Sequence, residues 1–265
     1  MRFLKKSYVG LMFLFLYAPI AILIIFSFNA SKSRGTWGGF TLDWYQKLFR
    51  DDALLTSLYN TVVIAVAAAV ISTLLGTVAA IAIYRMKGSA KSFMINLTYL
   101  PILNPDIVTG IALMLLMIYA RIPRGMFSML LSHITFCVPF VVISVLPKLR
   151  QLDPRLYDAA LDLGATPLKA YLSVILPEIA PGILTGLLMA FTMSIDDFVI
   201  SYFTTGNGVS NLSISIYSMA RRGINPKINA VLTLLFTSIL ILMAVIGRSM
   251  NRNTNNKNAE KKEGM

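Results

Sequence analysis

The sequence predicts an all-α integral membrane protein with six transmembrane helices. Its 265 residues are 56% hydrophobic, and their mean hydropathy is +0.70. The apolar residues gather in runs of roughly 20, the length that a helix needs to cross the hydrocarbon core of a bilayer. Soluble domains contain almost as many apolar residues, but they do not concentrate them in runs of this length.

Polar or basic segments separate the apolar runs. The predicted spans are residues 8–28, 61–83, 93–119, 126–146, 182–203 and 228–247. The first run also has the basic start of a signal peptide, but it is too long for one, contains Pro19 and has no small-x-small cleavage site after it. We therefore expect a retained helix. Residues 248–265 form a polar tail, which we expect to be disordered.

Lys and Arg residues predict the orientation. With six spans, both termini lie on one side of the membrane. The termini, residues 84–92 and residues 147–178 hold 15 of the 24 Lys and Arg residues, and the other connections hold 9. Because cytoplasmic segments carry the excess of positive charge, both termini and residues 147–178 are predicted to be cytoplasmic. The same rule accounts for the net charge of +12 without a nucleic-acid partner.

The third run is interrupted by prolines. Pro101 and Pro105 remove backbone donors from the middle of residues 93–119. Broken backbone at membrane depth is tolerated where it lines a cavity. We therefore expect this segment to line one.

A hydrophilic stretch, residues 147–178, lies between the fourth and fifth runs. Asp153 can cap a first short helix, and Gly164 suits its end because glycine adopts a left-handed backbone at low cost. Thr166 and Pro167 are a typical start for a second helix. The stretch is predicted to form a helical projection that a partner can grip.

Two further prolines follow this second helix. Pro177 and Pro181 are expected to break it before the fifth apolar run begins.

Three carboxylates lie in or near the apolar runs. They are Asp106, Asp196 and Asp197, and no Lys or Arg lies in the middle of any span. A charge at the bilayer centre costs about 2.5–3.5 kcal/mol on insertion scales, so such residues face a cavity, a partner or a transported ion. The pattern favours a cationic solute. The alternative is that these residues cap helices or pair with Arg221 or Arg222.

Aromatic and hydroxyl side chains at the same external level are weaker candidates for the solute path. Trp44 and Ser194 are the two that we include. Aromatic faces attract cations. Tyr99, Phe198 and Tyr202 lie at a similar level, but aromatic residues at the membrane interface also form the ordinary aromatic belt.

The sequence lacks the motifs of several function classes. No G-x-x-x-x-G-K-[ST] motif is present, so this chain should bind no ATP itself. His133 is the only histidine and is expected to be a packing residue, not a metal ligand. We expect no cofactor and no metal. An intramembrane aspartyl protease using Asp106 and Asp196 remains a remote alternative, but it lacks the G-x-G-D context and leaves residues 147–178 unexplained.

The hydrophilic stretch contains three motifs at fixed spacing. They are Asp158-Ala159-Ala160, Gly164 and Ile175-Leu176-Pro177. This pattern resembles the EAA loop of ABC importer permeases, with aspartate where that family usually has glutamate. In that family the loop is the coupling helix that docks on a cytoplasmic ATPase. The resemblance assigns coupling to Asp158, Ala159, Ala160, Gly164 and Pro177.

Three longer segments extend the resemblance over nearly the whole chain. They are NPDIV, LSHITFCVPFVV, and MSIDDFVISYF followed by TTG. They are similar to the PotC-type permease family of spermidine/putrescine ABC importers. The resemblance implies the type I permease fold in a bacterial inner membrane, a second permease forming a heterodimer, and two copies of an ATPase that hold ATP and magnesium. It also implies an extracytoplasmic polyamine-binding protein.

The solute stays open at this stage. The residues alone indicate only a cationic solute, and the resemblance implies a polyamine. The alternative is the same kind of permease for ferric ion, an amino acid or an anion. In either case the chain is expected to be a multi-pass transport subunit surrounded by lipid, and not an enzyme.

Overall fold

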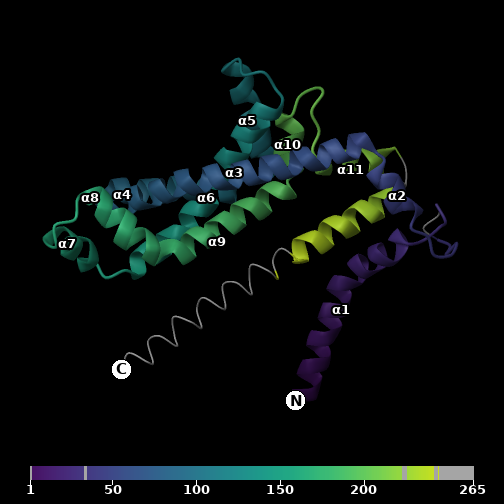
Figure 1. The fold of residues 1–265 in the computed structure, drawn as a ribbon, viewed down its shortest axis with the longest axis horizontal. Helices are drawn as coiled ribbons and strands as arrows, with labels where there is room; N and C mark the ends of the chain where they lie inside the picture. Colours follow the sequence, from purple (N-terminus) through teal and green to yellow (C-terminus); the bar gives the residue numbers. More distant parts are fainter. Residues whose placement is uncertain (1, 33–34, 223–225, 242–243, 245–265) are drawn as a thin grey trace. The chain divides into compact units, whose positions relative to one another are not determined.

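The computed structural model describes residues 2–32, 35–222, 226–241 and 244, and helices account for most of them (Figure 1). The first five helices are α1 (Arg2–Ser27), α2 (Asp43–Phe49), α3 (Asp52–Arg85), α4 (Gly88–Leu103) and α5 (Asp106–Tyr119). The next are α6 (Met126–Gln151), α7 (Arg155–Asp162), α8 (Pro167–Ala170), the π-helical turn η1 (Tyr171–Ile175), α9 (Leu176–Ile195), α10 (Val199–Thr204) and α11 (Leu212–Arg221). A further helix covers Lys227–Ile241.

Four of the described helical segments are long and apolar enough to cross a membrane. They are Lys6–Ser27, Asp52–Arg85, Met126–Gln151 and Pro167–Ile195. Helices α4 and α5 together make a fifth candidate, but they are bent by 106° at their junction. The predicted break is therefore present at Pro105, whereas Pro101 lies inside α4 and does not end it. The predicted span 228–247 lies partly outside the described residues, and the tail 248–265 lies wholly outside them.

The chain forms two compact units, which are described separately. One comprises residues 1–55 and 216–265, and the other comprises Thr56–Ser215. In the first unit, Asn29 organises the connection after α1. Its Oδ1 atom accepts hydrogen bonds from the backbone N–H of Ser31 at 3.1 Å and of Gly38 at 2.8 Å. Its Nδ2 atom donates to the carbonyl of Thr36 at 2.9 Å. The polar connection after α1 is therefore a folded loop.

The second unit is built around α6. Its fully buried residues Val141, Val145 and Leu149 form the core together with Ile179 of α9. A glycine permits the close approach of α3, because a Cβ atom added to Gly76 would lie 2.6 Å from the Cβ atom of Val141. Small residues allow such close packing between membrane helices.

Helix α9 approaches the same face of α6 through two glycines one turn apart. A Cβ atom added to Gly182 would lie 2.7 Å from Cγ of Lys148, and one added to Gly186 would lie 3.1 Å from Cγ1 of Val141. Helices α6 and α9 therefore run side by side (Figure 1). Their two ends carry the regions that the sequence singles out: α7 and α8 at one end, and α10 at the other.

Candidate transport site and coupling loop

Asp197 lies two residues before the short helix α10 and accepts hydrogen bonds from its first turns. Its Oδ2 atom accepts a hydrogen bond from the backbone N–H of Ser201 at 2.8 Å, and its Oδ1 atom accepts one from the N–H of Ile200 at 3.3 Å. The first amides of a helix have no partner within the helix, so a carboxylate at this position stabilises it. The predicted span 182–203 is therefore two helices, α9 and α10, separated at residues 196–198.

His133 joins α6 to this helix start. Its Nε2 atom lies 2.8 Å from Oγ of Ser201 and 3.5 Å from Oδ2 of Asp197, and its Nδ1 atom lies 2.6 Å from Oγ of Ser194. The histidine is only 2% exposed. Asn211 donates from Nδ2 to Oγ of Ser201 at 2.7 Å. We call these five residues the His133 network.

The His133 network fixes the geometry at this end of the second unit. It links α6, the end of α9, the start of α10 and the connection that leads to α11. Buried polar groups are costly unless they are hydrogen-bonded, and a fully satisfied network specifies one arrangement. The expectation that His133 is a satisfied packing residue is confirmed by these contacts. No cluster of three or more His, Cys, Asp or Glu side chains suited to a metal occurs among the described residues.

The two adjacent aspartates differ in their surroundings. The Asp197 side chain is 8% exposed and is held by backbone amides and His133. Asp196 is exposed, and it follows the last residue of α9. Its backbone carbonyl accepts a hydrogen bond from Oγ of Ser213 at 3.4 Å. Asp196 is therefore the more exposed residue of the pair.

Asp106 lies near the same helix contact. It is exposed in the first turn of α5, directly after Pro105. One turn further on, a Cβ atom added to Gly110 would lie 3.4 Å from the carbonyl oxygen of Val199 and 3.0 Å from the ring of Phe203. The α5–α10 contact therefore has an exposed acidic residue near the start of each helix: Asp106 is the first residue of α5, and Asp196 precedes α10.

Trp44 belongs to the first unit and has other partners. Its indole N–H donates to the carbonyl of Asn29 at 2.8 Å, and the side chain is 6% exposed. Nζ of Lys47 lies 4.7 Å from the centre of the indole ring. In this conformation the ammonium group of Lys47, from the same helix, already lies over the indole ring.

The hydrophilic stretch forms the predicted helix, break and helix. The Asp153 carboxylate accepts a hydrogen bond from the N–H of Arg155 at 2.9 Å, where α7 begins. Gly164 follows the end of α7 with a φ of +86°. Thr166 Oγ1 then accepts a hydrogen bond from the N–H of Lys169 at 3.4 Å and caps α8. The local sequence therefore determines both helix starts and the intervening turn.

The expectation that Pro177 and Pro181 break the second helix is wrong. The chain continues from α8 through η1 into α9, and Pro177 lies in the first turn of α9. Tyr171–Ile175 is a π-helical turn, which changes the hydrogen-bond register just before the proline. A proline lacks the N–H that an α-helix would use, so a change of register ahead of it lets the helical path continue.

The residues of the predicted coupling motif divide between two faces. Asp158 and Ala159 are exposed, whereas Ala160 is buried within the second unit. Leu163 is 90% exposed and Leu168 is 69% exposed. Large apolar side chains gathered in this way on a projecting loop are typical of a protein interaction surface.

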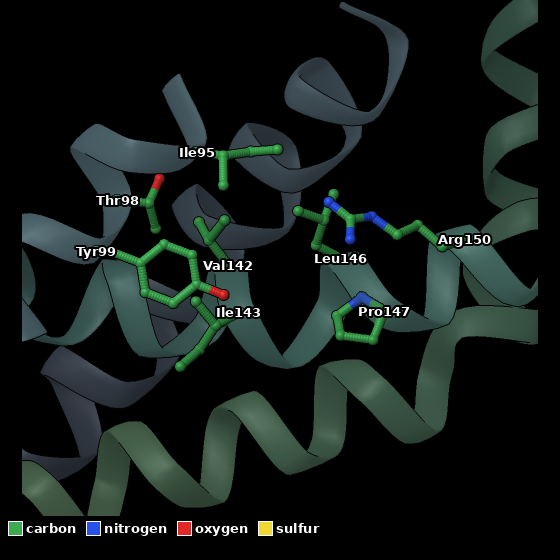
Figure 2. Close-up of a pocket in the computed structure, with 8 residues that line it drawn as sticks. All are labelled: Ile95, Thr98, Tyr99, Val142, Ile143, Leu146, Pro147 and Arg150. Carbon is green, nitrogen blue, oxygen red and sulfur yellow. The ribbon is translucent and has the colours of Figure 1, made fainter. Parts of the chain in front are cut away.

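A small cavity lies between α4 and α6. Figure 2 shows Tyr99 and Ile95 of α4 on one side, and Ile143, Leu146 and Arg150 of α6 on the other. Its volume is about 50 Å³. Pockets for small molecules measure roughly 300–1,000 Å³. This cavity is therefore too small to hold a solute of that size.

Membrane-length helices, a sharply bent helix pair and an exposed coupling-type loop define a membrane transport subunit. The sequence profile described as "Binding-protein-dependent transport system inner membrane component" matches residues 72–258. The chain belongs to this family, and it is an inner membrane component of an ABC import system. The predictions of family, localisation and a non-enzymatic transport role are confirmed.

Curated relatives match most of the chain. The spermidine/putrescine transport system permease protein PotC of Escherichia coli K12 is 38% identical, over 91% of this chain and 92% of its own. The putrescine transport system permease protein PotI of the same strain is 41% identical, over 87% of this chain and 84% of its own. PotC of Haemophilus influenzae is 34% identical, over 96% of this chain and 98% of its own.

Two solved structures share the fold. A chain of a bacterial alginate ABC transporter, in complex with an alginate-bound periplasmic protein, superposes with a TM-score of 0.70 at 17% identity. That match covers 92% of this chain and 90% of the other. A chain of the inward-facing MetNI methionine ABC transporter superposes with a TM-score of 0.61 at 16% identity, covering 76% of this chain and 95% of the other. The prediction of an ABC importer permease fold is confirmed.

The His133 network is only partly predictable from the sequence. Ser194 and Asp197 are expected there as solute candidates, whereas the structure joins them to His133, Ser201 and Asn211. A signal was available, because His133, Ser194 and Ser201 are polar residues within apolar runs. Their mutual contact depends on the packing of α6 against α9 and α10, which no local pattern reveals.

Proposed function

We propose that the chain is the permease subunit of an ATP-driven importer for polyamines. The relatives that match nearly its whole length are permeases of spermidine/putrescine and putrescine transport systems. Asp196 carries the proposal at the level of residues, because its carboxylate is exposed beside the anchored Asp197. A polyamine has several ammonium groups, so accessible carboxylates suit it.

The path for the solute is formed with a second, different permease. The cavity of about 50 Å³ between α4 and α6 is too small to be this path. Asp106 and Asp196 are the carboxylates that meet the solute. Asp197 and Ser194 act indirectly, by holding the start of α10. Trp44 is a weaker candidate, since Lys47 already lies over its ring.

Two copies of a cytoplasmic ATPase bind the loop formed by α7, α8 and η1. The ATPase subunits hold the ATP and magnesium. Asp158, Ala159, Gly164 and the exposed leucines face the partner, and the buried Ala160 holds the loop to the bundle. Pro177, exposed in the first turn of α9, lies where the loop joins that helix. Closure of the ATPase pair moves the loop, and the rigid α6–α9 pair carries this movement to the region of Asp196. The path then opens toward a polyamine-loaded binding protein, and ATP hydrolysis reverses the movement.

Uptake of labelled spermidine and putrescine tests the assignment, in cells that carry the complete transport system. We expect Asp196→Asn to reduce uptake by roughly tenfold, the weight of one charged contact of about 1.4 kcal/mol, while the complex still assembles. Asp52→Asn, which removes an exposed carboxylate from the first turn of α3, is the matched control and should transport normally. Full uptake by Asp196→Asn would contradict the role of this residue.

Absence of polyamine uptake in the wild type would favour the alternative, which is the same kind of permease with another solute such as ferric ion, an amino acid or an anion.

The assignment of the coupling loop has a separate test. Asp158→Lys should prevent copurification of the ATPase, and an intact complex with normal uptake would contradict that assignment.

A further inference from the structure

Arg85, the last residue of α3, is exposed and lies against two aromatic rings of the coupling loop. The guanidinium carbon of Arg85 lies 4.2 Å from the ring centre of Tyr157 and 5.2 Å from that of Tyr171. The two rings are themselves 5.2 Å apart and inclined by 45°. We call Arg85, Tyr157 and Tyr171 the Arg85 cluster. It joins three elements that are distant in sequence: α3, α7 and the π-helical turn η1.

The rings, and not a carboxylate, hold the Arg85 cation. Both ion pairs found within the part of the chain that the structure describes involve other residues. A guanidinium over the face of an aromatic ring is attracted by the negative potential of that face. Two rings from two different helical elements therefore converge on a single side chain, and loss of that side chain would release both.

The backbone that carries Arg85 is itself fixed. Nζ of Lys91, in α4, donates to the carbonyl of the preceding residue, Tyr84, at 3.0 Å and lies 5.4 Å from its ring. Further along α3, Gly76 is packed against Val141 of α6. The end of α3 is thus a firm point of attachment for the loop.

We propose that Arg85 is a positioning residue that fixes α7 and η1 to the end of α3, so that a displacement of the coupling loop also moves α3. This inference rests on the proposed function for the identity of the partner that displaces the loop. The position of this attachment matters because Tyr171 is the first residue of the π-helical turn. Such turns are frequent at functional sites. Arg85 thereby adds a second connection between the loop and the bundle, beside the continuous path from η1 into α9.

A distance measurement tests the attachment without relying on the solute. Cys137 is the only cysteine, so Cys137→Ser allows spin labels to be placed at Lys87→Cys and Asp162→Cys, both exposed, in the purified transporter. We expect a narrow distance distribution that Arg85→Gln broadens. Tyr157→Leu should broaden it in the same way, and Tyr157→Phe should not, since phenylalanine keeps the ring. Arg155→Gln, which removes a positive charge from the same loop, is the matched control.

The ATPase activity of the reconstituted transporter tests the consequence. We expect Arg85→Gln to lower the ratio of binding-protein-stimulated to basal activity by roughly threefold to tenfold, the loss that corresponds to two cation–π contacts. Arg85→Lys should give a ratio between those of the wild type and Arg85→Gln. Adding Tyr157→Leu to Arg85→Gln should lower the ratio little further. An unchanged ratio together with an unbroadened distance distribution would overturn the proposal.

Different results would refute the proposed function and the positioning role of Arg85. A wild-type complex that fails to copurify with an ATPase, or that no polyamine-loaded binding protein stimulates, would refute the proposed function. The distance measurement would still decide whether Arg85 positions the loop.

Discussion

The Nε2 atom of His133 lies 2.8 Å from Oγ of Ser201, and this contact ties α6 to α10. Both side chains are almost fully buried, at 2% and 0% exposure. The contact adds to a second buried polar link between the same helices, from Oγ of Ser128 to the carbonyl of Thr204 at 2.8 Å. It also distinguishes the two adjacent aspartates. The same imidazole lies beside Asp197, whereas Asp196 is exposed.

His133→Ala should destabilise the protein by about 2–4 kcal/mol, because it leaves Ser194, Ser201 and Asp197 short of a buried partner. Thermal unfolding of the purified permease in detergent measures the effect. Thr135→Ala, two residues away on the same helix and exposed, serves as the control and should change little. Equal unfolding temperatures for His133→Ala and the wild type would contradict a stabilising role for the network.

Gly76→Ala should also destabilise the protein, by about 1–3 kcal/mol, because overpacking forces helices apart. The added Cβ atom would lie 2.6 Å from Cβ of Val141, a distance at which one helix must move. Combining Gly76→Ala with Val141→Ala should recover part of the loss, since contacting sites are not additive. Gly10→Ala, where an added Cβ atom meets nothing within 4 Å, is the matched control. A simple sum of the two single effects would argue against the contact.

Gly164→Ala should weaken the coupling loop. The φ of +86° at this position is strained for any residue with a Cβ atom, at a cost of roughly 1 kcal/mol. Gly164→Asn should be milder, because asparagine tolerates the left-handed region better. Limited proteolysis of the loop follows the effect, and we expect cleavage to be fastest in Gly164→Ala. The same cleavage rate in all three proteins would exclude strain at this turn.

The ion pair of the first unit predicts a pH dependence. Nζ of Lys227 lies 3.0 Å from Oδ2 of Asp51. Partial burial acts to raise the pKa of Asp51, but the hydrogen bonds from Lys227 and from the N–H of Leu54, together with the lysine charge, hold this pKa below its ordinary value. A lowered native pKa stabilises the fold above the unfolded pKa of about 3.9, and this stability is lost as the pH falls through the native pKa.

Asp51→Asn should therefore lower the unfolding temperature near pH 6 and make no difference at pH values below the native pKa. The loss near pH 6 should be below about 1 kcal/mol, as for other partly exposed ion pairs. Unfolding scans of both proteins over this pH range measure it. A difference that grows as the pH falls would contradict the assigned direction.

Much of the fold can be read from local patterns. Runs of apolar residues define α3, α6 and α9, and Asp153, Gly164 and Thr166 mark the turns of the coupling loop because capping and left-handed backbone are local effects. The continuation of the helix through Pro177 could not be predicted, since it depends on the π-helical turn ahead of it. The Arg85 cluster and the His133 network were also beyond reach, because their partners come from separate helices.

The side chain of Leu163 is 90% exposed, and this has a consequence for the synthesis of the protein in cells. In the proposed complex the ATPase covers Leu163 and Leu168, so a copy synthesised without that partner presents both side chains to water. Such a surface attracts chaperones, other copies and proteases. Surplus copies should therefore be degraded faster than assembled ones. Balanced synthesis of the subunits then becomes a condition for accumulating the permease at all.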